Sequence, residues 1–161
     1  MEQAAVILKK GEGRTLKAGG AWIFDNEIDK VEGTPEDGSL VEVRDFDGYG
    51  MGTGFYNSRS KIRVRMMSRK AGQGVGRDFL RMRVQNAWDY RKKTVDTSSC
   101  RIIFGEADFL PGLVVDKFSD VLVVQSLALG IDRMKEEILS LLVEALRADG
   151  VEIRGIYERS D

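Results

Sequence analysis

The sequence predicts a mixed α+β fold in which a small β-barrel precedes a small α+β domain. Short apolar or alternating segments, separated by turns roughly every 8–12 residues, fill residues 1–70 and are typical of a barrel. A glycine-rich break follows at residues 71–76. After it, two long segments with helical periodicity occur among short apolar strands. We therefore place the domains at 1–70 and 71–161.

The first half consists of short strands and one helical turn. Ala4–Lys9 is an apolar, strand-prone segment, and Arg14–Lys17 is long enough for one turn of helix before Gly19 and Gly20 end it. Ala21–Phe24 forms a compact apolar anchor. Leu40–Arg44 alternates apolar and charged residues, as a half-buried strand does.

Two further strands of this half have unusual patterns. Tyr49–Tyr56 has glycine at every second position, which leaves one face of the strand bare for close approach by another backbone or a ligand. Lys61–Met66 alternates strictly, so its apolar residues point inward and Lys61, Arg63 and Arg65 point outward. These three cations repeat about every 6.6 Å, close to the phosphate spacing of an RNA strand.

The second half alternates helices with strands. Arg77–Thr94 is predicted to be a helix, with an apolar stripe that includes Leu80, Val84 and Trp88. Asp132–Leu146 is predicted to be a second helix with Asp132 as its N-cap. Four remaining segments are predicted to be strands: Arg101–Phe104, Leu113–Asp116, Val121–Ser126 and Val151–Tyr157. Val121–Ser126 is expected to be a central strand, because it is almost entirely apolar.

Composition excludes several kinds of chemistry. The chain has no histidine and one cysteine, Cys100, so it lacks histidine-based triads and dyads, an internal disulfide and the usual zinc ligand sets. No apolar run approaches the roughly 18 residues that cross a bilayer, and the N-terminus does not resemble a secretory signal. We therefore expect a cytoplasmic protein with no membrane partner.

The net charge of −1 hides a strong asymmetry. Residues 25–47 carry nine acids and two bases, whereas residues 54–93 carry twelve bases and two acids. A local basic block favours phosphate binding, because binding depends on the local field rather than on the overall charge. The alternative is two solvated faces that partly neutralise each other in the fold.

Few residues offer catalytic chemistry. Glu106 and Asp108 lie two apart in a loop, where they can bind a cation, act as acid and base, or brace the loop by accepting backbone hydrogen bonds. Bracing is favoured because no third ligand is nearby. Cys100 has no histidine to activate it. We expect no catalytic residue, no metal site and no cofactor site in this chain.

Several motifs nevertheless resemble those of one bacterial family. Residues 101–130, RIIFGEADFLPGLVVDKFSDVLVVQSLALG, and residues 156–161, IYERSD, resemble motifs of the class I S-adenosylmethionine-dependent 23S rRNA cytosine-C5 methyltransferases. Residues 8–12, LKKGE, with Arg14, Leu16 and the following AWIF, resemble the family's N-terminal PUA domain, an RNA-binding pseudobarrel. FYNSRSKIRVR, residues 55–65, matches a further stretch of that domain.

The chain departs from the family at several positions. Phe109 stands where the family usually has glycine, so we expect the backbone there to avoid positive φ. Ser58 replaces a proline, and Ser119 replaces a turn glycine. The family's cofactor loop, Asp-Pro-Pro motif and catalytic cysteine have no counterpart here, and Cys100 matches none of those positions.

The resemblance implies a PUA-like RNA-binding domain at 1–70 and a central α+β domain at 71–161, with the Rossmann-like methyltransferase domain absent from the chain. The full-length parent is expected to use S-adenosylmethionine, and the expected partner is RNA, ribosomal in origin; a homodimer is left open. The alternatives are a free-standing PUA-containing RNA-binding protein and a protein–protein adaptor. The basic residues assigned to RNA are Lys9, Lys10, Arg14, Arg59, Lys61, Arg63 and Arg65.

Arg63 and Arg65 have a second interpretation. They can instead pair with the acidic segment, residues 25–47, and serve the fold rather than RNA.

Overall fold

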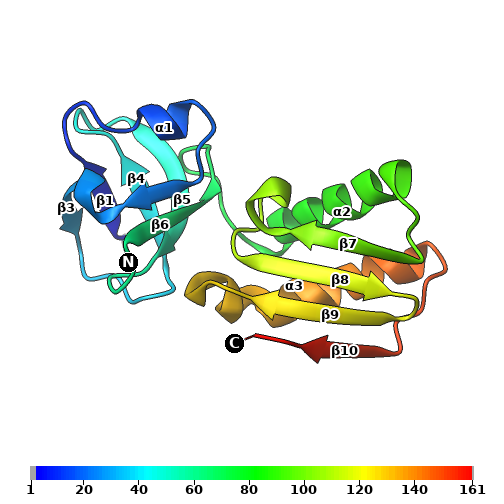
Figure 1. Cartoon of the computed structure of the whole chain (residues 1–161). Helices are drawn as coiled ribbons and strands as arrows, with labels where there is room; N and C mark the ends of the chain where they lie inside the picture. The colour runs from blue at the N-terminus through cyan, green and yellow to red at the C-terminus, as the bar shows by residue number, and fades with distance from the viewer. Residues whose placement is uncertain (1–2, 161) are drawn as a thin grey trace. The chain divides into compact units, whose positions relative to one another are not determined.

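A computed structural model describes residues 3–160 and divides the chain into two compact units, Met1–Gly74 and Val75–Asp161. Figure 1 shows the strands of the first unit in blue to green and the helices and strands of the second in green to red. The glycine-rich segment 71–76 lies where one unit ends and the next begins.

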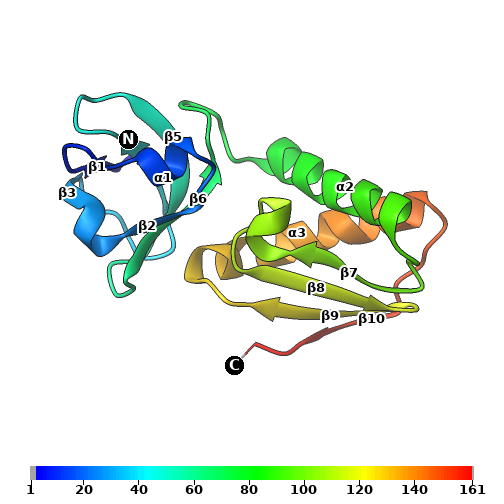
Figure 2. The ribbon, with the colours of Figure 1, turned by 45° about the horizontal axis from the view of Figure 1, so that its top comes forward.

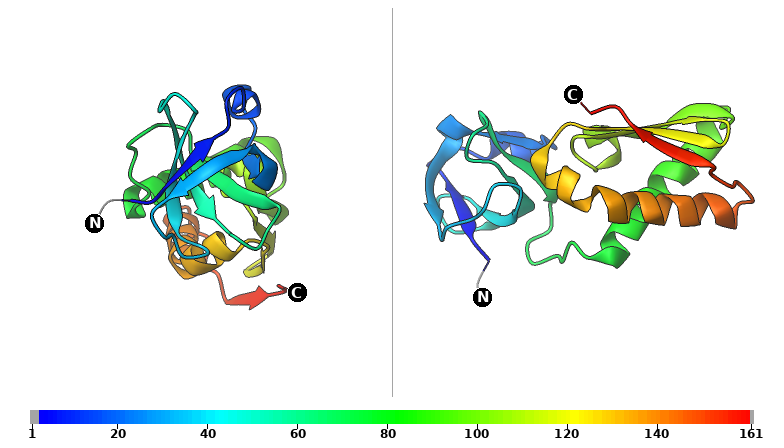
Figure 3. Two further views of the ribbon diagram at one scale, coloured as in Figure 1. Left: turned by 90° about the vertical axis from the view of Figure 1, so that its left-hand side faces the viewer. Right: turned by 90° about the horizontal axis from the view of Figure 1, so that it is seen from below.

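The first unit is a curled six-stranded sheet (Figure 3, left). Its strands follow the order β2-β6-β5-β4-β1-β3, and all neighbours are antiparallel except β1 and β4. A single helical turn, α1, and a 3-10 turn, η1, connect the early strands. The bounds are β1 Ala5–Leu8, α1 Arg14–Lys17, β2 Trp22–Phe24, η1 Asp25–Glu27, β3 Ile28–Glu32, β4 Leu40–Arg44, β5 Gly50–Tyr56 and β6 Ile62–Ser68.

The core of this unit comes from inward-facing residues of several strands. Val6, Ile23, Val41, Val43 and Val64 are almost completely buried. Burial of such side chains contributes about 1.5–3 kcal/mol each. The alternation predicted for Lys61–Met66 is confirmed, because Val64 and Met66 join this core.

The bare face of β5 serves close backbone packing. A Cβ atom at Gly52 would lie 2.0 Å from the carbonyl oxygen of Ser68, and one at Gly54 would lie 2.6 Å from that of Arg65. Both neighbours belong to β6, which pairs with β5. The glycine pattern was expected to allow close approach by another backbone or by a ligand. The structure confirms the approach of another backbone.

The second unit has a four-stranded sheet in the order β10-β9-β8-β7, in which β10 is parallel to β9 and the other neighbours are antiparallel. Both long helices cover one face of this sheet (Figures 2 and 3). Val121–Ser126 is an inner strand, as predicted. The bounds are α2 Arg77–Thr94, β7 Ser99–Phe104, η2 Gly105–Asp108, β8 Leu113–Phe118, β9 Val121–Ser126, α3 Leu129–Ala148 and β10 Gly155–Glu158.

Three local predictions are corrected. Asp132 is not an N-cap: α3 already begins at Leu129, and the amide of Asp132 donates to the carbonyl of Ala128. The buried Ile131 explains this earlier start, since packing of the first turn outweighs a capping preference. The last strand is only Gly155–Glu158, because that stretch alone pairs with β9. In Ala21–Phe24, only Ile23 is buried; Trp22 and Phe24 face solvent.

The acidic segment also contains a strand that the sequence did not predict. Ile28–Glu32 forms β3, which pairs with β1 at the edge of the curled sheet. Its inward residues, Ile28 and Val31, are only partly buried, so the alternation signal is weak. Asp161, the last residue of the IYERSD motif, lies outside the described residues.

Candidate nucleic-acid interface

The basic residues of β6 lie on its outer face. Arg63 and Arg65 alternate with the buried Val64, and the exposed Lys61 precedes the strand. The carbonyl of Lys61 accepts a hydrogen bond from the amide of Asp25 (2.9 Å), which fixes the start of β6 beside the end of β2. The backbone pairing therefore presents a row of cations along β6, as the sequence predicts.

Arg63 is partly engaged within the fold. Its Nε donates to the carbonyl oxygen of Ser60 (3.1 Å), and its guanidinium lies 3.8 Å from the carboxylate of Asp25. Its side chain is 26% exposed. Arg63 thus has the acidic neighbour that the structural interpretation expects, while part of its surface remains open.

Arg65 has an aromatic neighbour. Its Cζ atom lies 5.1 Å from the centroid of the Trp22 ring, a cation–π distance, and Trp22 is paired with Arg65 in the β2–β6 register. Phe24, two residues along β2, lies edge-on to Trp22. Sequence reasoning missed both aromatics because it treated Ala21–Phe24 as one apolar anchor. All four residues are apolar, so the sequence alone does not show which of them point outward.

The other predicted cations flank β2. Lys9 and Lys10 follow β1, and the amide of Lys9 donates to the carbonyl of Glu27 in η1, directly after β2. Arg14 begins α1, which precedes β2. All three are exposed, and within residues 3–160 none of them takes part in an ion pair. Lys9 therefore lies beside the segment that follows β2, and Arg14 lies in the helical turn that precedes β2 in the chain.

Arg69, which the sequence did not single out, holds the α1–β2 connection in place. Its guanidinium donates to the carbonyl oxygens of Gly20 (2.6 Å), Gly19 (2.8 Å) and Leu16 (3.3 Å). These partners lie about fifty residues away in the sequence, so no local pattern identifies the contact. Arg69 ties the helical turn to the end of β6 and is a positioning residue for the interface.

Arg59 lies on the turn before β6. Its side chain is 91% exposed, with Nε 3.9 Å from Asp37. Asp37 also accepts hydrogen bonds from the amide and hydroxyl of Ser58 (2.7 and 3.0 Å). The aspartate therefore organises the turn and leaves most of the Arg59 side chain free to contact a ligand.

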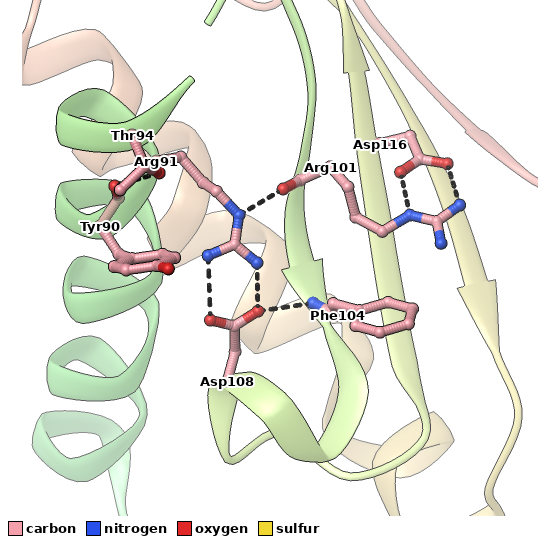
Figure 4. Close-up of polar contacts among 7 residues, drawn as sticks. All are labelled: Tyr90, Arg91, Thr94, Arg101, Phe104, Asp108 and Asp116. Carbon is pink, nitrogen blue, oxygen red and sulfur yellow. Dashed lines mark hydrogen bonds and ion pairs between the residues drawn. The ribbon is translucent and has the colours of Figure 1, made fainter. Parts of the chain in front are cut away.

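In the second unit, Glu106 and Asp108 brace a loop, as predicted. Glu106 Oε1 accepts a hydrogen bond from the amide of Gly112 (2.9 Å), and Asp108 accepts one from the amide of Phe104 (2.7 Å). Arg91 reaches from α2 to both oxygens of Asp108 (3.2 and 2.7 Å) and to the carbonyl of Arg101 (2.6 Å; Figure 4). Among the described residues, no three acids or cysteines cluster as a metal site would require.

The loop contradicts the expectation for Phe109. Its φ is +59°, in the left-handed region that glycine favours. The 3-10 turn η2 requires this conformation: the amides of Phe109 and Leu110 donate to the carbonyls of Glu106 and Gly105. Arg83 supports the residue by donating to its carbonyl (2.7 Å). Ser119 also has a positive φ, of +56°.

A cavity of about 440 Å³ lies beside this network, lined by Val95, Cys100 and Phe104 with the two arginines Arg91 and Arg101. Both guanidiniums are committed to carboxylates: Arg91 to Asp108, and Arg101 to Asp116 (2.7 and 3.1 Å). Burial raises the pKa of the Cys100 thiol, which disfavours the reactive thiolate. The cavity therefore lacks an activated nucleophile.

The described residues do not fit a nucleotide-type cofactor such as S-adenosylmethionine. Such cofactors bind at a glycine-rich turn between a parallel strand and a helix. The single parallel strand–helix–strand unit found in residues 3–160 is β9–α3–β10, and its first turn, Leu127-Ala128, contains no glycine. The glycine-rich segment 71–76 does not supply such a turn either, because it follows β6, whose neighbours in the curled sheet are antiparallel.

The family comparison identifies the first unit. Residues 6–69 match the model of the PUA-like domain family. The N-terminal unit is therefore similar to PUA-like domains in sequence and has a matching curled sheet. The match spans all six strands of the curled sheet, from within β1 to the end of β6.

Curated relatives match almost the whole chain. It is 34% identical over 161 residues to ribosomal RNA large subunit methyltransferase I of Pseudoalteromonas translucida. It is 36% identical over 160 residues to the protein of the same name from Vibrio cholerae serotype O1. Each alignment covers 98% of this chain and 39% of the relative. The chain thus spans well under half the length of these relatives.

Solved structures share the fold at lower identity. A chain from Streptococcus mutans, described as a SAM-dependent methyltransferase, superposes with a TM-score of 0.78 at 17% identity. A methyltransferase complexed with SAH gives 0.79, also at 17% identity. Each match covers 97% of this chain and 40% of the other.

No helix in the described part of the chain is long and apolar enough to cross a membrane.

Proposed function

We propose that this chain is the RNA-binding portion of an S-adenosylmethionine-dependent ribosomal RNA (cytosine-C5) methyltransferase. The observation that carries the proposal is the PUA-like unit within a chain that is similar over 98% of its length to large-subunit rRNA methyltransferases. The parent protein acts on ribosomal RNA in the cytoplasm. A homodimer stays a prediction.

The chain's own contribution is to bind and place RNA. Residues 1–70 supply the PUA-like RNA-binding domain, and residues 71–161 form the central domain that connects it to the catalytic part of the parent. The cofactor and the nucleophile belong to that catalytic part, because the described residues contain neither a fitting turn for the cofactor nor an activated cysteine. We expect calorimetry of the 161-residue chain with S-adenosylmethionine to show no binding; micromolar 1:1 binding would contradict this division of labour.

The proposed interface consists of cations around β2 and β6. Most of the field that attracts phosphate comes from four exposed residues that form no ion pair within residues 3–160: Lys9, Lys10, Arg14 and Lys61. The remaining three, Arg59, Arg63 and Arg65, also hold local structure. Arg63→Gln is therefore expected to weaken RNA binding and lower stability, whereas Arg65→Gln weakens binding with a smaller effect on melting temperature.

Photo-crosslinking to total ribosomal RNA tests the proposed target. The 161-residue chain is crosslinked to the RNA by ultraviolet light, and the RNA attached to it is sequenced. We expect one region of large-subunit RNA to be enriched. A variant with Lys9, Lys10 and Arg14 changed to glutamine should lose this enrichment. A matched triple variant in α2, at Arg77, Arg81 and Lys93, should retain it. Crosslinks spread evenly over both ribosomal RNAs would contradict the proposal.

A further inference from the structure

Two large aromatic side chains face solvent on β2. Trp22 is 36% exposed and Phe24 is 42% exposed, although the strand contains only three residues. Ile23 between them is buried, so the alternation of the strand places both rings on the outer face. Neither ring contributes to the apolar cluster that holds the unit together.

The two rings form one surface. Their centroids are 6.3 Å apart with an interplanar angle of 79°, an edge-to-face arrangement that keeps the pair ordered. The Arg65 guanidinium lies over the Trp22 ring at 5.1 Å. An ordered aromatic pair beside cations is the composition of surfaces that stack unpaired bases while their phosphates are neutralised.

Other exposed aromatics of the same unit have different surroundings. Phe46 and Tyr49 lie on the β4–β5 turn, where Asp45 accepts hydrogen bonds from the amides of Asp47 and Tyr49. Two acids on that turn repel phosphate. Of these exposed rings, Trp22 and Phe24 are the ones beside the row of basic residues on β6.

We propose that Trp22 and Phe24 form a base-stacking site for unpaired RNA, with Arg63 and Arg65 contacting the phosphates that flank the stacked base. The inference rests on the proposed RNA-binding function and adds that the unit selects single strands over duplex. In a duplex, bases are stacked on one another and their faces are inaccessible, so the aromatic pair then contributes nothing to affinity.

Equilibrium binding with two probes tests this selection. The probes are a 12-nucleotide oligouridine and an RNA duplex of similar phosphate number, titrated into the 161-residue chain. We expect the double variant Trp22→Leu/Phe24→Leu to lose about 5- to 100-fold in affinity for the single strand. Its affinity for duplex and its salt dependence should be unchanged. The conservative variant Trp22→Phe should retain most of the single-strand affinity.

Tryptophan fluorescence supplies a second readout. The chain has two tryptophans, and Trp88 is only 2% exposed, with its indole nitrogen bonded to Asp149 (2.7 Å). Stacking should therefore quench Trp22 emission and leave Trp88 emission in place. Tyr49→Leu, an exposed aromatic change on the acidic turn, serves as the control and should not alter binding.

The outcomes separate the two proposals. If wild-type chain binds RNA but the double variant keeps its single-strand affinity, or loses single-strand and duplex affinity equally, the stacking site is wrong and the proposed function stands. If wild-type chain binds neither probe, both are overturned. The circular dichroism spectrum and melting temperature of the double variant check that its first unit is folded, because Trp88 lies in the second unit and does not report on it.

Discussion

At the scale of single residues, the second unit depends on one buried ion pair. Arg91 and Asp108 have side chains only 11% and 9% exposed, and their bidentate contact joins α2 to the loop after β7. The bracing role of Asp108 was predictable from its loop position. Its partner was not, because Arg91 comes from a different element, 17 residues away.

Asp108→Asn should lower the free energy of unfolding by roughly 3–5 kcal/mol, because removing one charge of a buried pair leaves the other uncompensated. Urea denaturation measures the change. Asp78→Asn provides the control, since Asp78 is fully exposed and its ion pair with the half-exposed Arg81 should contribute little. Equal stability of Asp108→Asn and wild type would show that the pair does not hold the loop.

Phe109 stores backbone strain in the loop after β7, because its φ lies in the left-handed region that glycine favours. A bulky residue with φ of +59° costs of order 1–3 kcal/mol. Phe109→Gly should therefore raise the free energy of unfolding by about 0.5–1 kcal/mol, after the greater freedom of glycine in the unfolded chain is subtracted. Phe109→Ala removes the ring without relieving the strain and should give no gain in thermal denaturation. If both variants gained equally in the free energy of unfolding, the destabilisation would come from the aromatic ring rather than from the strained backbone.

At the scale of elements, most helices and strands followed from periodicity, and the exceptions have physical causes. The helix Arg77–Thr94 is confirmed at both ends. The start of α3 was missed because tertiary packing of Ile131 outweighs local capping. β3 was missed because it is an edge strand whose apolar residues are only half-buried. The outward aromatics of β2 were missed because a short apolar run does not reveal which face is inside.

Gly54→Ala should destabilise the PUA-like unit by at least about 2 kcal/mol. The added Cβ would lie 2.6 Å from both the Arg65 carbonyl oxygen and the Val64 side chain, so β5 and β6 must separate. Gly74→Ala is the matched control, because its Cβ would meet nothing within 4 Å. Circular dichroism during urea titration measures both. A Gly54→Ala variant as stable as the control would mean that the sheet accommodates the methyl group.

The attachment of β10 to α3 is expected to depend on pH. Lys135 contacts both Glu158 (2.5 Å) and Asp132 (2.9 Å), and its hydrogen bonds lower the pKa of both carboxyls. A carboxyl whose pKa is lowered in the folded state stabilises the fold above its unfolded value, near 4. That stabilisation is lost as pH falls through the lowered folded value.

Lys135→Gln should therefore be less stable than wild type at pH 6 and approach it in stability at pH 2–3, in urea titrations at each pH. Lys93→Gln, an exposed lysine of α2, should follow the wild-type profile. A constant difference between Lys135→Gln and wild type across this range would assign the role of Lys135 to packing rather than to charge.

At the scale of the whole molecule, the sequence accounts for the fold class and for where the basic residues lie. It does not reveal how they are used, because that depends on contacts between distant strands. Arg63 meets Asp25 and Arg65 meets Trp22 through the β2–β6 pairing, and Arg69 reaches back to the α1–β2 connection. The result is a PUA-like unit in which the exposed aromatics of β2 lie beside the basic residues of β6.

The salt dependence of RNA binding tests whether these cations contact RNA. Affinity of the 161-residue chain for single-stranded ribosomal RNA should fall linearly on a log–log plot against salt concentration. Changing Lys9, Lys10, Arg14 and Lys61 to glutamine should flatten the slope by about 0.7 for each phosphate that the protein no longer neutralises, with the melting temperature unchanged. An unchanged slope and affinity in this quadruple variant would contradict the assignment of the β2–β6 surface to RNA.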